Sequence, residues 1–281
     1  MIEDMPLHTL ATGRYFEAPR WRDGFLWLVD SLARTVSRID CNGHCEALCE
    51  VPDVPAGLGF LPTGEAVVTA MLRRSLLRYS GGRVTNYVDL SNVARGTIDD
   101  MIIDGEGRSF VGDLGFDLRL GVPADPTGGL VVVTPDGVAR IGATGLRFPN
   151  GIAISSDNRN LIVAESHGDC LSQFEVGSDG ALTFRRRFAH IGEPDGICLD
   201  REGGVWISAF REDAVVRVDR EGHITDRIAL PGRGIACALG GEDRCSLFCI
   251  SAQTTHEELA RGVSTSRLDM IRVTIPGAGH P

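Results

Sequence analysis

Lysine is absent from the sequence, so all 28 basic residues are arginine, and they are outnumbered by 38 acidic residues. The net charge is −10. An acidic chain with no basic stripe does not attract a polyanion, and we therefore expect no nucleic acid among its partners. The same charge is compatible with a bound cation or simply with good solubility.

Long apolar runs are also absent, because no stretch approaches the roughly 18 residues that a membrane-spanning helix requires. The first residues, MIEDMPLHTLATGR, contain neither a basic start nor an apolar segment, so they do not resemble a secretory signal. We therefore expect a cytoplasmic protein with no membrane partner, present as a monomer or a weak homo-oligomer.

Several catalytic signatures are missing as well. The sequence contains no G-x-S-x-G elbow, no phosphate-binding P-loop and no G-x-G-x-x-G followed by a helix. These absences argue against serine hydrolases, nucleotide-binding enzymes and dinucleotide-dependent enzymes.

The eight cysteines do not form a familiar metal motif. Cys41, Cys45 and Cys49 follow a C-x3-C-x3-C spacing rather than the C-x2-C pairs of zinc sites. Asn42 and Gly43, between the first two, are a strong signal for a hairpin turn, with Cys49 on the returning strand. In a cytoplasmic protein these thiols are expected to be reduced.

Glycine is abundant, with 35 residues, and it accompanies an internal repeat. Each copy has one variable residue, a short apolar run, a polar turn with glycine or asparagine, and a second apolar run, as in NGIAISSDNRNLIVA and DGICLDREGGVWISA. The copies are spaced by 39 to 51 residues. Their first residues are Glu17, Ala56, Asp99, Asn150, Asp195 and Ile235.

Two further β-like runs joined by a turn follow most copies, as in SLLRYS-GG-RVTNYVDL. Four short strands in about 40 residues are typical of a propeller blade. We therefore predict an all-β fold, a six-bladed β-propeller with four antiparallel strands per blade, formed by residues 1–281 as a single domain. The last copy lacks room for its fourth strand, so the N-terminal LHTLATGRYF is expected to close the ring. A β-sandwich is the alternative, but it does not predict so regular a repeat.

The inner strands of a propeller surround a central channel, so equivalent repeat positions meet at one mouth of it. Four of the six positions carry oxygen donors: Glu17, Asp99, Asn150 and Asp195. Three carboxylates at one mouth repel one another unless protons or a cation neutralise them. Oxygen donors favour a hard divalent ion such as Ca²⁺, Mg²⁺ or Mn²⁺, and Zn²⁺ also binds carboxylates. The alternative is that these are ordinary turn residues that face water.

Three motifs, FEAPRW, RFPNGIAIS and EPDGICLD, are supported by DDMIIDGEGRSFVGD, LIVAES and the closing PGAG. Through them the chain resembles the SMP-30/gluconolactonase/LRE-like family of six-bladed propellers over nearly its whole length. By this resemblance, Glu17, Asn150 and Asp195 match the family's metal-binding residues. The resemblance implies hydrolysis of a lactone to a hydroxy acid by a water that one divalent cation activates, with Ca²⁺ as the first expectation.

Two positions depart from the family pattern. The family commonly has Asn-Asp where this chain has Asp99-Asp100, and its sugar-lactone members commonly have an arginine at the position of Thr97. Asp99 adds a negative charge and cannot donate a hydrogen bond when it is ionised. It could tighten cation binding, act as a base, or disfavour a polyhydroxylated substrate. These changes make a sugar lactone a doubtful substrate, more than they put lactone hydrolysis in doubt.

Two aspartates are candidates for the general base. Asp195 is the first choice for the general base and Asp99 the second. Asp99, Asp100 and His167 are expected to contact the small-molecule lactone, with a plain surface-loop position as the alternative for His167. The glycine- and proline-rich insertion 114–128 is either a lid over the site or an ordinary connection between strands. The alternative function is a non-hydrolytic or non-enzymatic ligand-binding propeller.

Overall fold

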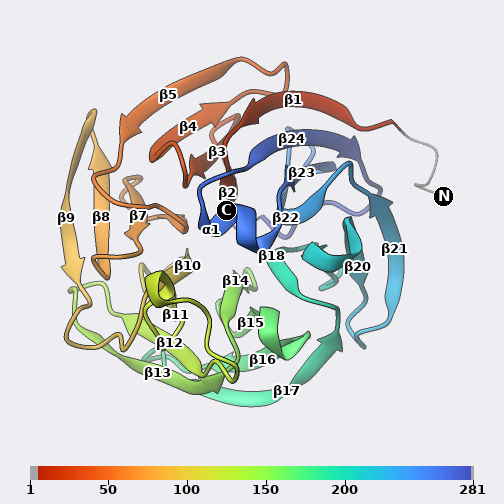
Figure 1. The fold of residues 1–281 in the computed structure, drawn as a ribbon. Coiled ribbons are helices and arrows are strands. Elements are labelled where there is room, and N and C mark those ends of the chain that lie inside the picture. The colour runs from red at the N-terminus through yellow and green to blue at the C-terminus, as the bar shows by residue number, and fades with distance from the viewer. Residues whose placement is uncertain (1–5, 280–281) are drawn as a thin grey trace.

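The computed structural model describes residues 6–279 and shows six four-stranded antiparallel sheets arranged as a ring around a central axis (Figure 1). Each sheet is one blade, so the prediction of a six-bladed propeller is confirmed. The innermost strands contact one another in chain order around the axis. They are β2 (Phe16–Arg22), β6 (Leu58–Phe60), β10 (Ile98–Ile103), β14 (Pro149–Ile154), β18 (Pro194–Leu199) and β22 (Arg233–Gly240). We call the end of the ring at which these strands begin the entry end.

The other strands of each blade follow outward from the axis. The second strands are β3 (Phe25–Asp30), β7 (Ala66–Ala70), β11 (Ser109–Asp113), β15 (Asn160–Glu165), β19 (Val205–Ala209) and β23 (Ser246–Gln253). The third strands are β4 (Thr35–Ile39), β8 (Ser75–Ser80), β12 (Gly128–Val133), β16 (Cys170–Val176), β20 (Ala214–Val218) and β24 (Thr265–Arg272). The outermost strands are β5 (Cys45–Glu50), β9 (Arg83–Asp89), β13 (Ala139–Leu146), β17 (Leu182–His190), β21 (Ile224–Ala229) and β1 (His8–Gly13).

The ring is closed by the N-terminal strand, as predicted. β1 pairs antiparallel with β24, with His8 opposite Met270 and Gly13 opposite Ser266. The sixth blade therefore takes three strands from the C-terminal part of the chain and one from the N-terminal part (Figure 1). This arrangement covers an edge of β24 that would otherwise present unpaired backbone groups.

Burial falls from the axis outward. β7, β11 and β19 are buried at every position, whereas most residues of β5 and β9 are at least partly exposed. Strands covered on both faces are apolar throughout, which explains runs such as AVVTA and VWISA. Apolar clusters fill the spaces between neighbouring blades; for example, Ile162 of one blade packs in a cluster with Ile207 and Val216 of the next.

The helical segments are short. They are the 3₁₀ turns η2 (Leu118–Leu120), η3 (Ser166–Gly168) and η4 (Phe210–Glu212) and the α-helix α1 (His256–Ala260). Each follows a second strand, so all four lie at the entry end, and α1 projects over the axis in Figure 1. No helix in the described part of the chain is long and apolar enough to cross a membrane.

The cysteine-rich segment forms the predicted hairpin. Ile39 pairs with Cys45 across the turn, and Gly43 adopts φ +84°, a conformation that favours glycine. Cys49 lies on the returning strand β5, and all eight cysteines are free thiols.

Candidate active site

The four oxygen-bearing repeat positions occupy the same place in their strands. Each is the second residue of an inner strand and lies where the pairing with the next strand shifts register. They are Glu17 in β2, Asp99 in β10, Asn150 in β14 and Asp195 in β18. A bulge at this point turns the local side chain out of the regular alternation of the sheet. The two remaining positions, Ala56 and Ile235, are apolar and buried.

Carboxylates at the ends of the second strands hold the loops that lead into these inner strands. Asp30 accepts hydrogen bonds from two backbone amides of the loop before Glu17, at 2.7 and 3.1 Å. Asp113 accepts two from the loop before Asp99, both at 2.9 Å. Glu165 accepts one from Arg147 N–H in the loop before β14, at 2.7 Å. A carboxylate at the end of the second strand therefore holds the loop before the inner strand in three of the blades.

The acids at the entry end raise one another's pKa values. Burial raises the pKa of Glu17 well above its ordinary value, and the charges of Asp195, Asp99 and Asp100 raise it further. Burial and then the Asp99 charge do the same to the pKa of Asp195, while the Asn150 amide partly offsets the effect. Burial, followed by the Asp100 charge, raises the pKa of Asp99 to about 7. The structure thus brings these side chains within strong electrostatic reach of one another.

The Asn150 side chain is held by a short chain of hydrogen bonds. Its Nδ2 donates to Ser166 Oγ at 3.2 Å, and Ser166 Oγ donates to the Pro194 carbonyl at 2.8 Å. Because the nitrogen is engaged, the Asn150 carbonyl oxygen is the atom left to accept a ligand. Nearby, Asp195 Oδ1 is buried and finds no hydrogen-bond partner among the described residues.

This donor set fits a hard cation. A buried carboxylate oxygen without a partner is costly in a folded protein, and a bound cation removes that cost. No three His, Cys, Asp or Glu side chains within residues 6–279 are close enough to hold an ion by themselves. The predicted set of Glu17, Asn150 and Asp195 contains only two such side chains, so an ion there also depends on the Asn150 oxygen.

Comparison with known proteins identifies the family. Residues 16–253 match the model of the SMP-30/Gluconolactonase/LRE-like region. The chain belongs to this family. It is 27% identical over 277 residues to 6-deoxy-6-sulfogluconolactonase of Pseudomonas putida, covering 94% of this chain and 93% of that protein. It is 26% identical over 251 residues to regucalcin of Gallus gallus, with coverages of 85% and 83%. A solved gluconolactonase from Xanthomonas campestris superposes with a TM-score of 0.77 at 26% identity, covering 95% of this chain and 91% of the other.

Membership of the SMP-30/gluconolactonase family confirms the resemblance drawn from FEAPRW, RFPNGIAIS and EPDGICLD. The matched region contains all four oxygen-bearing positions and ends before the closing PGAG. The region that identifies the family therefore contains all the positions that the repeat picks out as the candidate site.

Asp100 is engaged in a contact between blades. Arg20 Nη2 donates to Asp100 Oδ1 at 3.0 Å, and the Ile152 amide donates to Asp100 Oδ2 at 3.2 Å. Both side chains of the ion pair are buried. The Asp100 carboxylate therefore stabilises the packing of neighbouring blades. Without it, Arg20 would be an unpaired buried charge. A substrate contact by Asp100, as predicted, would have to share this carboxylate with Arg20.

His167 lies at the entry end in the turn η3, next to Ser166. Its ring stacks on Phe148, with centroids 5.1 Å apart. Partial burial of the ring lowers the pKa of His167 below its ordinary value. The residue as a whole is nevertheless exposed to solvent. The residue is therefore both near the site and on the surface, so the two interpretations from sequence are compatible.

A second histidine at the entry end was not predicted. His256 Nε2, at the start of α1, lies 2.6 Å from Glu193 Oε1, and its ring stacks on Phe210 with centroids 4.5 Å apart. Glu193 lies two residues before Asp195 and also pairs with Arg211 at 2.9 Å. These contacts join the sixth blade to the fifth. Glu193 belongs to the motif EPDGICLD, but nothing in the sequence around His256 indicates this contact.

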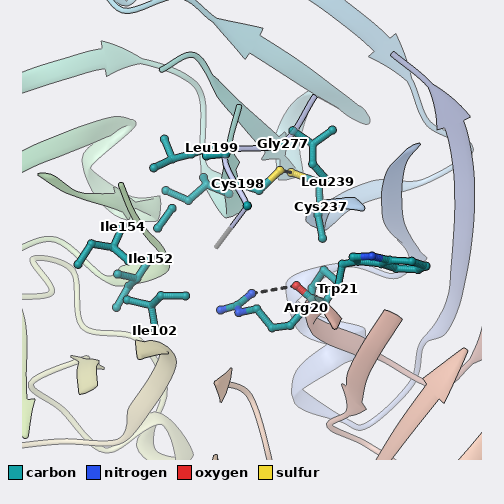
Figure 2. Close-up of a pocket in the computed structure, with 16 residues that line it drawn as sticks. Arg20, Trp21, Ile102, Ile152, Ile154, Cys198, Leu199, Cys237, Leu239 and Gly277 are labelled. Atoms are coloured by element: carbon teal, nitrogen blue, oxygen red, sulfur yellow. Dashed lines mark hydrogen bonds between the residues drawn. The ribbon is translucent and has the colours of Figure 1, made fainter. Parts of the chain in front are cut away.

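The pocket in Figure 2 is formed between the inner strands and the C-terminal segment. Arg20, Ile152, Cys198 and Cys237 line it from the middle and far parts of the inner strands, and Gly277 of the C-terminal segment covers one side. The four oxygen-bearing positions are not among its lining residues. The pocket therefore does not include these positions, although Arg20, which lines it, pairs with Asp100 at 3.0 Å.

Proposed function

We propose that this chain is a hydrolase that opens a lactone to a hydroxy acid with the help of one divalent cation. The observation that supports this most directly is that Glu17, Asp99 and Asp195 raise one another's pKa values at equivalent positions of the inner strands, with a buried Asp195 oxygen that lacks a partner among the described residues. A scaffold protein has no need for acids that repel one another at equivalent positions of its inner strands. Two of the relatives described above are named as gluconolactonases, and both match more than nine-tenths of this chain.

Glu17, Asn150 and Asp195 are the proposed ligands of the cation. Their donors are all oxygen, which favours Ca²⁺, with Mn²⁺, Mg²⁺ and Zn²⁺ as alternatives. When bound, such an ion supplies Lewis acidity for the lactone carbonyl and lowers the pKa of a coordinated water. Ser166 keeps the Asn150 oxygen available by occupying the Asn150 nitrogen.

A carboxylate of this chain acts as the general base. It takes a proton from the attacking water and returns one to the ring oxygen as the ester bond breaks, so the product is the hydroxy acid. Asp195 is the first candidate because it is also a proposed ligand of the cation and its buried Oδ1 has no hydrogen-bond partner among the described residues. Asp99 is the second, and its raised pKa of about 7 suits a base that works near neutral pH.

The test is hydrolysis of a panel of γ-, δ-, sugar and aromatic lactones by pH-stat, with each candidate cation added in turn. Asp195→Ala and Asn150→Ala are expected to abolish turnover even when the cation is restored. Glu221→Ala, which removes an exposed acid from the turn before β21, is the matched control and keeps full activity. Near wild-type hydrolysis by either site variant would overturn the proposed mechanism.

Asp99→Asn separates the two candidate bases. If Asp99 is the base, this variant binds the cation but loses roughly 10²- to 10⁴-fold in kcat. If Asp195 is the base, Asp99→Asn keeps most of the wild-type rate. Calorimetric titration with Ca²⁺ supplies the binding measurement. Cation binding by the wild type without turnover of any lactone would favour the alternative of a ligand-binding propeller.

A further inference from the structure

Three aromatic rings at the entry end, including that of His167, form a continuous face that the chemical step described above does not use. The centroids of Phe116 and Phe148 are 6.0 Å apart, and the Phe148 and His167 rings stack at 5.1 Å with an interplanar angle of 28°. The two phenylalanines are half-buried and His167 is exposed, so part of this face is open to solvent. We call Phe116, Phe148 and His167 the aromatic wall.

One end of the aromatic wall is fixed to the strand that carries Asp99. The Thr97 amide donates to the Phe116 carbonyl at 2.8 Å, and Thr97 Oγ1 accepts a hydrogen bond from the Leu118 amide at 3.0 Å. Gly96 packs so closely on the Phe116 backbone that a Cβ atom at Gly96 would collide with it. Phe116 is therefore anchored beside β10 before any ligand binds.

The other end of the aromatic wall adjoins Asn150. Phe148 lies two residues before Asn150, and His167 directly follows Ser166, which holds the Asn150 amide. Phe148 adopts φ +60°, a left-handed conformation in which a bulky side chain is strained. Such strain persists where the surrounding structure imposes it, and it concentrates at sites that bind ligands.

The surroundings of the aromatic wall do not suit a charged ligand. Arg147 precedes Phe148 and Arg119 follows Phe116 in the chain, and each is paired with an aspartate, at 2.8 and 2.6 Å. Arg211, whose charge acts on His167, is paired with Glu193 at 2.9 Å. The acid cluster beside the wall repels an anionic substituent. On the same insertion as Phe116, Leu120 is 86% exposed and Val122 is 43% exposed, and they add apolar surface.

We propose that the aromatic wall binds a planar, apolar substituent of an uncharged lactone, so that the substrate class is a lactone with an aromatic or similarly flat group. This inference rests on the proposed lactone hydrolysis and adds the kind of substrate. Aromatic groups stack favourably on one another in offset or edge-to-face arrangements, beyond the gain from burying their area. Stacking on Phe148 holds the substituent next to Asn150, at the side of the acid cluster.

Binding can be measured apart from hydrolysis with two cyclic ethers that lack the carbonyl group, 2-phenyltetrahydropyran and tetrahydropyran. Titration calorimetry of the full chain with Ca²⁺ present is expected to give at least about tenfold tighter binding of the phenyl compound. Phe148→Gly removes a ring and relieves the strained conformation, and Phe116→Ala removes its neighbour. Each is expected to lower this preference several-fold. Phe184→Ala, the matched control, removes a 53% exposed ring from the outer strand β17 and leaves the preference unchanged.

Hydrolysis provides the second measurement. The ratio of kcat/KM for phenyl-substituted δ-valerolactone to that for δ-valerolactone is expected to exceed one and to fall in both wall variants. Unchanged ratios in the wall variants, or a wild type that prefers glucono-δ-lactone, would overturn the inference and leave lactone hydrolysis standing. Failure to hydrolyse any lactone, combined with a phenyl preference that depends on Phe148, would instead overturn the proposed function and retain the wall as a binding face.

Discussion

Three acidic side chains at the entry end disfavour one another's ionised forms. Glu17, Asp99 and Asp195 are brought together from three blades, and each has a raised pKa because burial and the other acids disfavour its ionised form. Acids that repel one another in this way destabilise the folded chain when no ion is bound. Their presence is explained if a cation normally shares the site.

Ser166 is expected to act as a positioning residue. Its hydroxyl accepts from the Asn150 amide and donates to the Pro194 carbonyl, so removing it lets the Asn150 side chain rotate. Ser166→Ala should weaken Ca²⁺ binding by about tenfold, as is typical when a residue that orients a metal ligand is lost. Turnover at saturating Ca²⁺ should stay close to that of the wild type. Calorimetric titration measures the affinity, and an unchanged affinity would show that the hydroxyl does not orient Asn150.

At the scale of elements, the four site residues depend on irregular strands. The inner strands shift register at the residues that carry oxygen donors, and acids at the ends of β3, β11 and β15 hold the loops just before them. The repeat spacing predicts where these strands begin. The bulge itself has no distinct sequence signal in this chain, because Asp-Gly and Asn-Gly also occur in ordinary turns.

The closing strand β1 should contribute measurably to stability. Leu10 is the buried residue of β1 and packs in the cluster that includes Phe248 and Leu268. Leu10→Ala is expected to lower the free energy of unfolding by about 2–4 kcal/mol, through lost apolar burial and the cavity that remains. Thr9→Ala, at an exposed neighbour on the same strand, should change it by less than about 0.5 kcal/mol. Urea unfolding measures both. Equal effects of the two substitutions would mean that β1 is not firmly docked.

At the scale of the whole molecule, the ring brings residues that are far apart in sequence to one end of the axis. Each blade packs on its two neighbours, and β1 joins the last blade to the first. The geometry of the acid cluster therefore depends on closure of the ring, and cation binding should in turn stabilise the closed ring.

The stability of the ion-free protein should fall as the pH rises from about 5 to 8. Burial raises the folded-state pKa of Asp99 to about 7, whereas an unfolded aspartate titrates near 4, so the folded chain binds more protons within this window. The free energy of unfolding therefore decreases with rising pH in the presence of EDTA. Added Ca²⁺ should restore more stability at pH 8 than at pH 5, because it competes with protons for the same oxygens.

Thermal unfolding of the wild type and Asp99→Asn between pH 5 and 8 provides the measurement. Asp99→Asn removes one of the buried titrating acids, so its melting temperature in EDTA should depend less on pH. The difference between the two chains separates this effect from the titration of the histidines. Parallel curves for the two chains would contradict a raised pKa at Asp99.

The amino-acid sequence by itself determined the blades, their number and the closing strand. Repeated apolar runs separated by glycine turns are local patterns, and each blade forms largely from residues close together in the chain. The repeat also predicted the candidate residues Glu17, Asp99, Asn150 and Asp195, because equivalent positions of a symmetric ring must face the same end.

Only the tertiary structure decided what those residues touch. The Arg20–Asp100 ion pair spans 80 residues, the contact of Ser166 with Pro194 spans 28, and His256 reaches Glu193 from another blade. The aromatic wall combines the insertion, the loop before β14 and the turn η3. Such contacts depend on how neighbouring blades are rotated and packed against each other, and no periodicity within a single blade encodes that arrangement.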